Sequence, residues 1–146
     1  MTEQNSSEWV MAQTLWGEAR GEPLAGKVAV ANVIMTRFKN PCWWSRNRGD
    51  GIPDDTIEAV CKDPWQFSCW NKDDPNRSKI EALTTADSAF RECLTVAQLA
   101  IEGLLADKTD GATHYHHEAI MPSWVINYRL DPCYRVGGHL FYNDVP

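Results

Sequence analysis

Apolar residues recur at helical spacing in the N-terminal part of the chain. The first such series consists of Trp9, Ala12, Leu15, Trp16 and Ala19. It predicts an amphipathic helix that begins at Ser6 or Ser7, either of which can cap it, and ends near Arg20. A second helix is predicted from Pro23 to about Arg37, and its apolar residues leave almost no polar side. This second helix must therefore be buried on nearly all sides.

The middle of the chain alternates between loop-like and helical patterns. Residues 39–53 and 63–78 are rich in Pro, Asn and Asp and predict irregular loops, each with several aromatic residues. Residues 55–62 predict a short helix. A longer amphipathic helix is predicted from about residue 84, and it should end before Gly111. Aromatic residues in polar loops favour either the wall of a cleft or packing beneath the loop.

The last third of the chain favours strands. Residues 113–117 alternate as in a strand, and residues 136–142 predict strand residues around the Gly137–Gly138 turn. Helices followed by a small sheet predict an α+β fold, predominantly helical, with a small antiparallel β element near the C-terminus. The 146 residues are enough for one hydrophobic core and short for two, so we expect a single domain over residues 1–146.

Composition and charge exclude several classes of protein. Fourteen Lys and Arg against 20 Asp and Glu give a net charge of −6, which argues against a nucleic-acid partner. No apolar stretch reaches the roughly 18 residues of a membrane span, and the N-terminus lacks the pattern of a secretory signal. The five cysteines are irregularly spaced, which favours reduced, buried thiols. We expect a monomer without stable membrane insertion, made in the cytoplasm and exported, if at all, by another component.

Glu18 is the first candidate for catalysis. It is predicted in the last turn of the first helix, beside Gly17, which leaves room for a ligand. The helix dipole is negative there and Trp16 could exclude water, and both raise the pKa of a carboxyl toward that of a general acid. Arg20 would oppose this if it pointed inward. A solvated or ion-paired Glu18 is the alternative, and Glu22 is interpreted as a structural cap or ion-pair partner.

Several motifs occur in an order that is more specific than any one of them. The first runs from Gly17 to Val33 and is followed by the basic residue Arg37, and the second is Gln66-Phe67-Ser68. The third is made of the segments 111–116, 122–124 and 137–142. With these motifs, the chain resembles the SleB-like cell-wall hydrolase family, which includes spore-cortex lytic enzymes and phage endolysins.

The resemblance implies a lysozyme-like catalytic domain that cleaves peptidoglycan between N-acetylmuramic acid and N-acetylglucosamine, with Glu18 as the catalytic glutamate. Six further residues are candidates for substrate binding: Gln66, Ser68, Tyr115, His116, Trp124 and Tyr128. The first four match family positions expected near the cleft and could hydrogen-bond sugar groups, and the last two could stack on sugar rings. A packing role is the alternative for each of the six.

The number of carboxylates bears on the mechanism. Ordinary glycosidases need two, whereas a lytic transglycosylase can use one, because the C6 hydroxyl of N-acetylmuramic acid attacks its own anomeric carbon. No second carboxylate in the sequence lies in a motif comparable to that of Glu18, which favours a lytic transglycosylase that forms 1,6-anhydromuramic products. Asp63, Asp73, Asp74 and Glu118 are possible second carboxylates, so a muramidase is the alternative.

The histidines suggest a different chemistry. On a strand, His114 and His116 point to the same side and could share a cation with His139, as a zinc-dependent cell-wall amidase would require. Hydrogen-bonded or exposed histidines are the alternative, and the resemblance implies no metal and no cofactor. A noncatalytic wall-binding module is a third possibility that the seven tryptophans alone would permit.

The expected biological role follows from the resemblance and the missing signal. We expect an endolysin of a bacteriophage or prophage, released from the cytoplasm to the cell wall during cell lysis by a membrane pore-forming partner.

Overall fold

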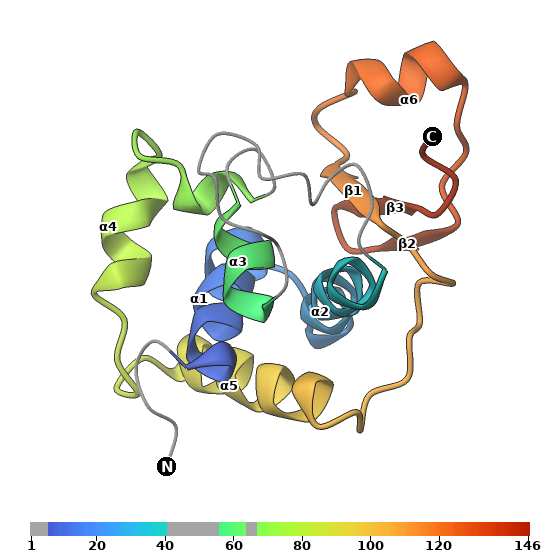
Figure 1. The fold of residues 1–146 in the computed structure, drawn as a ribbon. Helices are drawn as coiled ribbons and strands as arrows, with labels where there is room; N and C mark the ends of the chain where they lie inside the picture. Colours follow the sequence, from blue (N-terminus) through green and yellow to red (C-terminus); the bar gives the residue numbers. More distant parts are fainter. Residues whose placement is uncertain (1–5, 41–55, 64–66) are drawn as a thin grey trace.

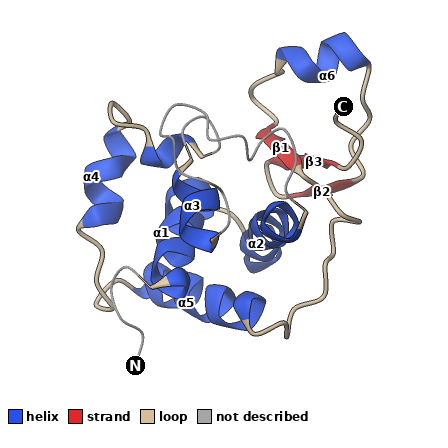
Figure 2. Ribbon diagram, viewed as in Figure 1, coloured by secondary structure: helices blue, strands red, loops and turns tan. Residues whose placement is uncertain are grey.

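The computed structural model describes residues 6–40, 56–63 and 67–146, and its helices and strands are shown in Figures 1 and 2. The helical part consists of α1 (Ser7–Ala19), α2 (Leu24–Lys39), α3 (Ile57–Lys62), the 3-10 helix η2 (Ser68–Trp70), α4 (Pro75–Glu81) and α5 (Ser88–Ile101). The C-terminal part consists of β1 (His114–His117), α6 (Ser123–Tyr128), β2 (Tyr134–Val136) and β3 (His139–Tyr142). The predicted α+β, predominantly helical fold is therefore confirmed.

Helix α2 lies between α1, α3 and α5 on one side and the sheet on the other (Figure 1). Every residue from Val28 to Ile34 is buried, which confirms the prediction of a buried central helix. The one polar residue in this run, Asn32, is used by the fold: its side chain accepts a hydrogen bond from the Lys108 amide at 3.1 Å and donates one to the Ala106 carbonyl at 3.4 Å. It thereby fixes the segment that leads from α5 to the sheet.

The start of α1 agrees with its predicted cap, whereas α2 and α5 begin later than predicted. The Ser6 hydroxyl accepts a hydrogen bond from the Trp9 amide at 3.2 Å, as expected for the cap of α1. Asp87 caps α5 in the same way, so this helix begins at Ser88, later than its apolar pattern suggests. Pro23 lies at the N-cap of α2, one position before the first turn in which it was expected.

Three short helical elements were not predicted. Residues 68–78 were expected in a loop, and this prediction is wrong: they contain η2 and the start of α4, where Asp74 caps the helix and Pro75 occupies its first position. The third is α6. The predicted loop at 39–53 falls almost wholly outside the described residues. The four described cysteines are free thiols, of which Cys61, Cys69 and Cys93 are buried.

The sheet has the strand order β1-β3-β2 and is antiparallel, with the hairpin β2–β3 turning at Gly137 and Gly138. Because side chains alternate along a strand, the sheet has two distinct faces. The face toward α1, called the α1 face, carries Tyr115, His117, His139 and Phe141. The opposite face, called the α6 face, carries His114, His116, Leu140 and Tyr142, and Trp124 of α6 packs on it.

None of the helices among the described residues is long and apolar enough to cross a membrane.

Candidate active site

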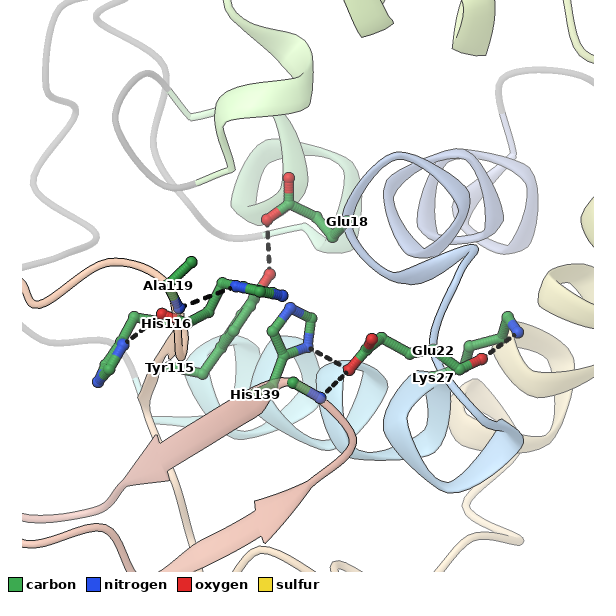
Figure 3. A network of polar contacts seen from close by, with 9 residues as sticks. Glu18, Glu22, Lys27, Tyr115, His116, Ala119 and His139 are labelled. Atoms are coloured by element: carbon green, nitrogen blue, oxygen red, sulfur yellow. Dashed lines mark hydrogen bonds and ion pairs between the residues drawn. The ribbon is translucent and has the colours of Figure 1, made fainter.

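Glu18 lies in the last turn of α1, opposite the α1 face of the sheet (Figure 3). Two adjoining cavities of about 330 and 430 Å³ meet at this residue. Both are lined by Gly17, Glu18, Asn76, His117 and His139. The larger one also reaches Ser68, Tyr115 and Ile120. The carboxyl therefore faces open space between the helical part and the sheet.

Tyr115 holds the carboxyl group of Glu18. Its hydroxyl donates a hydrogen bond of 2.6 Å to Glu18 Oε1 (Figure 3). Its ring stacks on Phe141, with centroids 5.4 Å apart, and contacts His139 at 5.1 Å. Burial and the nearby Glu18 carboxylate raise the pKa of Tyr115 well above its usual value, so the phenol keeps its proton and acts as a donor.

Burial raises the pKa of Glu18 above its ordinary value. Hydrogen bonds from Tyr115 and Cys69 act in the opposite direction, and the negative charge of Asp74 adds to the increase. Arg20 is exposed and forms no ion pair with Glu18: its guanidinium lies 4.1 Å from the Trp16 ring centroid and donates a hydrogen bond to Asn76 Oδ1 at 3.3 Å. Glu18 thus has the raised pKa that a general acid needs.

Gly17 serves a purpose other than the one expected. A Cβ atom at this position would lie 2.6 Å from Cβ and 2.8 Å from Sγ of Cys69, which is too close. The space that a Cβ atom of Gly17 would take is therefore filled by Cys69 of η2, while Gly17 also lines both cavities at Glu18. The absence of a side chain allows η2 to approach α1, and this brings Ser68 to the cavity beside Glu18.

Glu22 connects the end of α1 to the hairpin. Its Oε1 accepts a hydrogen bond of 2.7 Å from the Gly138 amide and lies 3.8 Å from Nδ1 of His139 (Figure 3). Burial lowers the pKa of His139 despite the opposing effect of Glu22, so the ring is neutral at pH 7. Lys27 donates a hydrogen bond to the Glu22 carbonyl at 2.9 Å. Glu22 therefore makes a structural contact, in agreement with its interpretation from the sequence.

The histidines do not form the cation site that was considered. His114 and His116 lie on the α6 face and His139 lies on the α1 face, so the three rings do not converge. Burial and the charge of Arg37 lower the pKa of His114 to about 3. Over the described ranges, no group of three or more His, Cys, Asp or Glu side chains is placed to hold a metal ion.

The fold brings some of the candidate substrate-binding residues to the Glu18 cavities and places others away from them. Ser68 is exposed and lines the larger cavity with Tyr115. His116 also lines this cavity, but its ring nitrogens lie 2.9 Å from the Tyr142 hydroxyl and 2.9 Å from the His117 carbonyl oxygen. Gln66 lies outside the described residues.

Trp124 and Tyr128 are not brought to Glu18. Trp124 packs against His114 and Tyr142, with centroids 5.4 and 5.1 Å away, and Tyr128 is 55% exposed on α6. Sequence reasoning missed Asn76, because α4 was not predicted. It also missed His117, which the alternation of β1 places on the same face as Tyr115.

The possible second carboxylates lie elsewhere. Glu118 forms an ion pair with Arg135 at 2.6 Å, and the Asp74 carboxylate accepts a hydrogen bond from the Asn76 amide at 2.8 Å. Asp73 is exposed and Asp63 is buried. Among the described residues that line the two cavities, the only carboxyl groups are those of Glu18 and Glu22.

Solved structures identify the type of fold. The chain is similar to the catalytic domain of the Bacillus cereus SleB protein, with a TM-score of 0.64 and 24% identity over 97% of this chain and 92% of that chain. It is also similar to the catalytic domain of the germination-specific lytic transglycosylase SleB from Bacillus anthracis, with a TM-score of 0.63 and 24% identity over 96% of each chain. The fold is that of a SleB-type catalytic domain.

Sequence comparison identifies the family. A family model described as cell wall hydrolase matches residues 21–142, and the chain belongs to this family. The recognised resemblance is thereby confirmed. Because the match begins after Glu18, the case for Glu18 depends on its geometry and on the resemblance of its segment.

Two curated relatives carry the same description. A spore cortex-lytic enzyme of Halalkalibacterium halodurans is 29% identical over 135 residues, which are 92% of this chain and 34% of that protein. A spore cortex-lytic enzyme of Bacillus subtilis is 49% identical over 37 residues, 25% of this chain and 12% of that protein. The chain therefore spans about a third of the length of the H. halodurans protein.

Proposed function

We propose that this protein degrades peptidoglycan by cleaving the glycan bond between N-acetylmuramic acid and N-acetylglucosamine, as a lytic transglycosylase. The main observation is the Glu18 carboxyl, which has a raised pKa, faces open cavities and receives a hydrogen bond from a tyrosine that keeps its proton. Membership of the cell wall hydrolase family and the names of the relatives support this substrate.

In the first step of the proposed reaction, the protonated Glu18 carboxyl donates its proton to the glycosidic oxygen, and the bond from that oxygen to the anomeric carbon of N-acetylmuramic acid breaks. The hydrogen bond from Tyr115 stabilises the carboxylate that forms. In the second step this carboxylate accepts the proton of the C6 hydroxyl, whose oxygen bonds to the anomeric carbon. The product has a 1,6-anhydro ring, and Glu18 is protonated again.

One observation favours this reaction over hydrolysis by a muramidase. Of the described carboxyl groups that line the cavities, the one besides Glu18 belongs to Glu22, whose Oε1 already accepts a hydrogen bond from Gly138 at 2.7 Å. A nucleophile must direct an oxygen at the reacting carbon and a general base must direct one at the attacking water, whereas the bond to Gly138 holds the Glu22 carboxyl group against the hairpin. The separation of His139 from His114 and His116 on opposite faces argues against a zinc amidase.

A digest of purified sacculi tests the proposal. Mass spectrometry should detect 1,6-anhydromuramic ends, whereas reducing ends would establish the muramidase alternative. Glu18→Gln removes the acid with little change in shape and should lower the rate by about 100-fold or more. The control is Glu118→Gln, which changes an exposed carboxylate in the loop between β1 and α6 and should keep full activity. Full activity in the Glu18→Gln protein would refute the role of Glu18.

The role as a phage endolysin is a finer part of the proposal and is supported by the family resemblance alone. It includes synthesis in the cytoplasm and release by a pore-forming partner. Expression in bacteria tests it: lysis should require co-expression of a membrane pore, and lysis without one would contradict this part.

A further inference from the structure

A third cavity, larger than either of those at Glu18, lies beside the first turn of α4. Its volume is about 650 Å³, and we call it the Trp70 cavity. Its lining includes Lys62, Trp70, Lys72, Asp73, Asp74 and Arg77. It shares no described lining residue with the two cavities at Glu18. No residue of it has been used in the proposed reaction.

The Trp70 cavity and the Glu18 cavities lie on two sides of the same short elements. Asn76 lines the Glu18 cavities, whereas its chain neighbours Pro75 and Arg77 line the Trp70 cavity. Likewise Ser68 and Trp70, at the two ends of η2, line different cavities. An α-helix with its side chains is about 10–12 Å across, and an extended peptide spans up to about 3.5 Å per residue, so a peptide substituent of four or more residues on a sugar held at Glu18 is long enough to pass over α4 to the Trp70 cavity.

Three cationic side chains, Lys62, Lys72 and Arg77, line this cavity, although the net charge of the protein is −6. Lys62 Nζ lies 4.8 Å from the centroid of the Trp70 ring. Arg77 is anchored, since it donates a hydrogen bond to the Trp70 carbonyl at 3.2 Å and pairs with Glu81 at 3.4 Å. Lys72 is exposed. In the part of the chain that the structure describes, neither Lys62 nor Lys72 forms an ion pair.

Two carboxylates, Asp73 and Asp74, line the cavity beside the three cations. Asp74 uses its carboxylate to cap α4 through the Asn76 amide, at 2.8 Å. Asp73 is exposed at the rim. An indole in contact with Lys62, together with a second lysine in the same cavity, suits a ligand that carries both carboxylates and small apolar groups.

We infer that the Trp70 cavity binds the acidic peptide stem of the N-acetylmuramic acid residue whose glycosidic bond lies at Glu18. This inference rests on the proposed function. The stem is attached to the lactyl group of that sugar, carries free carboxylates and contains alanine methyl groups. Lys62 and Lys72 bind its carboxylates, and Trp70 supplies the apolar floor of the cavity.

Kinetics on two substrates test the inference. Glycan strands with intact stems are compared with the same strands after an amidase has removed the stems. The Lys62→Gln/Lys72→Gln protein should show about fivefold to tenfold lower kcat/KM on strands with stems and the wild-type value on strands without them. Equal losses on both substrates, or no loss on either, would overturn the inference.

The matched control is Lys79→Gln/Lys108→Gln. These lysines are also exposed, and the control changes the net charge by the same amount, but neither residue lines the Trp70 cavity. It should behave as the wild type on both substrates. A loss in the control equal to that in the test variant would mean that net charge alone is responsible, and would also overturn the inference.

A binding measurement separates this inference from the proposed function. If the wild type cleaves neither substrate, the proposed function fails, and the cavity is then tested with the free stem peptide released by the amidase. In NMR titrations the peptide should shift the amide signals of Asn71 to Arg77 in the wild type and the Lys79→Gln/Lys108→Gln control, but not in Lys62→Gln/Lys72→Gln. No shift in the wild type, or equal shifts in all three proteins, would refute peptide binding.

Discussion

The two faces of the small sheet carry similar side chains and use them differently. On the α1 face, the Tyr115 hydroxyl donates a hydrogen bond to Glu18 and its ring contacts His139. On the α6 face, Nε2 of His116 lies 2.9 Å from the Tyr142 hydroxyl, and the His116 and Tyr142 rings are stacked with their centroids 5.4 Å apart. A tyrosine and a histidine thus serve the site on one face and packing on the other. The element opposite each face, α1 or α6, makes the difference.

The largest expected effect on stability comes from a substitution at Gly17, where α1 and η2 pack closely beside the Glu18 cavities. Gly17→Ala places a methyl group 2.6 Å from Cβ of Cys69, and neither backbone can yield easily. We expect a loss of about 2–3 kcal/mol in the free energy of unfolding, together with lower activity, because η2 must move away from α1. Urea denaturation measures the first and the sacculus digest the second.

Gly21→Ala is the control for this substitution, because a Cβ atom at Gly21 meets nothing within 4 Å. It should leave stability and activity almost unchanged. Similar losses in both alanine variants would show that the contact between α1 and η2 is not as tight as described.

The α6 face should account for part of the loss of stability in acid. The pKa of His114 is lowered to about 3 in the folded protein from a usual value of 6.5, so the unfolded chain binds an extra proton between these pH values. Stability from the neutral ring is present above pH 6.5 and is lost as pH falls toward 3.

Replacement of this ring tests the acid effect. Between pH 7 and pH 4.5, the wild type should lose about 2 kcal/mol more free energy of unfolding than His114→Gln. Equilibrium unfolding in urea at the two pH values measures this difference. Parallel losses in the two proteins would mean that His114 is protonated as readily in the folded state as in the unfolded state.

On the α1 face, Tyr115→Phe should lower activity by about tenfold, because the Glu18 carboxylate loses its hydrogen bond. The Tyr115 hydrogen bond lowers the pKa of Glu18, so its removal raises that pKa. The alkaline limb of the pH-rate profile, where Glu18 loses its proton, should therefore move to higher pH. An unchanged profile would contradict the assigned contact.

The smallest effect is expected from the equivalent change on the α6 face. Tyr142→Phe removes the hydroxyl beside His116 Nε2 and should cost about 1 kcal/mol of stability. Activity and the pH-rate profile should not change, as measured beside the Tyr115→Phe protein. A displaced profile would indicate that the two faces are coupled through the sheet.

Much of the fold was predictable because its signals are local. The spacing of apolar residues located α1, α2 and the sheet, and the continuous apolar run in α2 implied its burial. The three short helical elements η2, α4 and α6 were missed because they contain too few residues for a periodic pattern. The Asp74-Pro75 pair at the start of α4 was the available signal, and it was interpreted as part of a loop.

The site was predictable in part. The segment around Glu18 resembles that of the family, and the position of Glu18 near the end of α1 follows from the helix boundary. Alternation along the predicted strand separates Tyr115 from His116, but the sequence did not show which of the two faces meets Glu18, since both residues match the same motif. In the structure it is the face of Tyr115, whose hydroxyl donates a hydrogen bond to Glu18 Oε1.

The sequence by itself determined which segments form helices or strands, which helix is central, and that one glutamate has a special position, because these depend on neighbours along the chain. Only the tertiary structure decided that Cys69 fills the space at Gly17, that Glu22 holds the hairpin, and that Tyr115 meets Glu18. These contacts join residues far apart in the chain, and no local pattern specifies which distant side chain will occupy a given space.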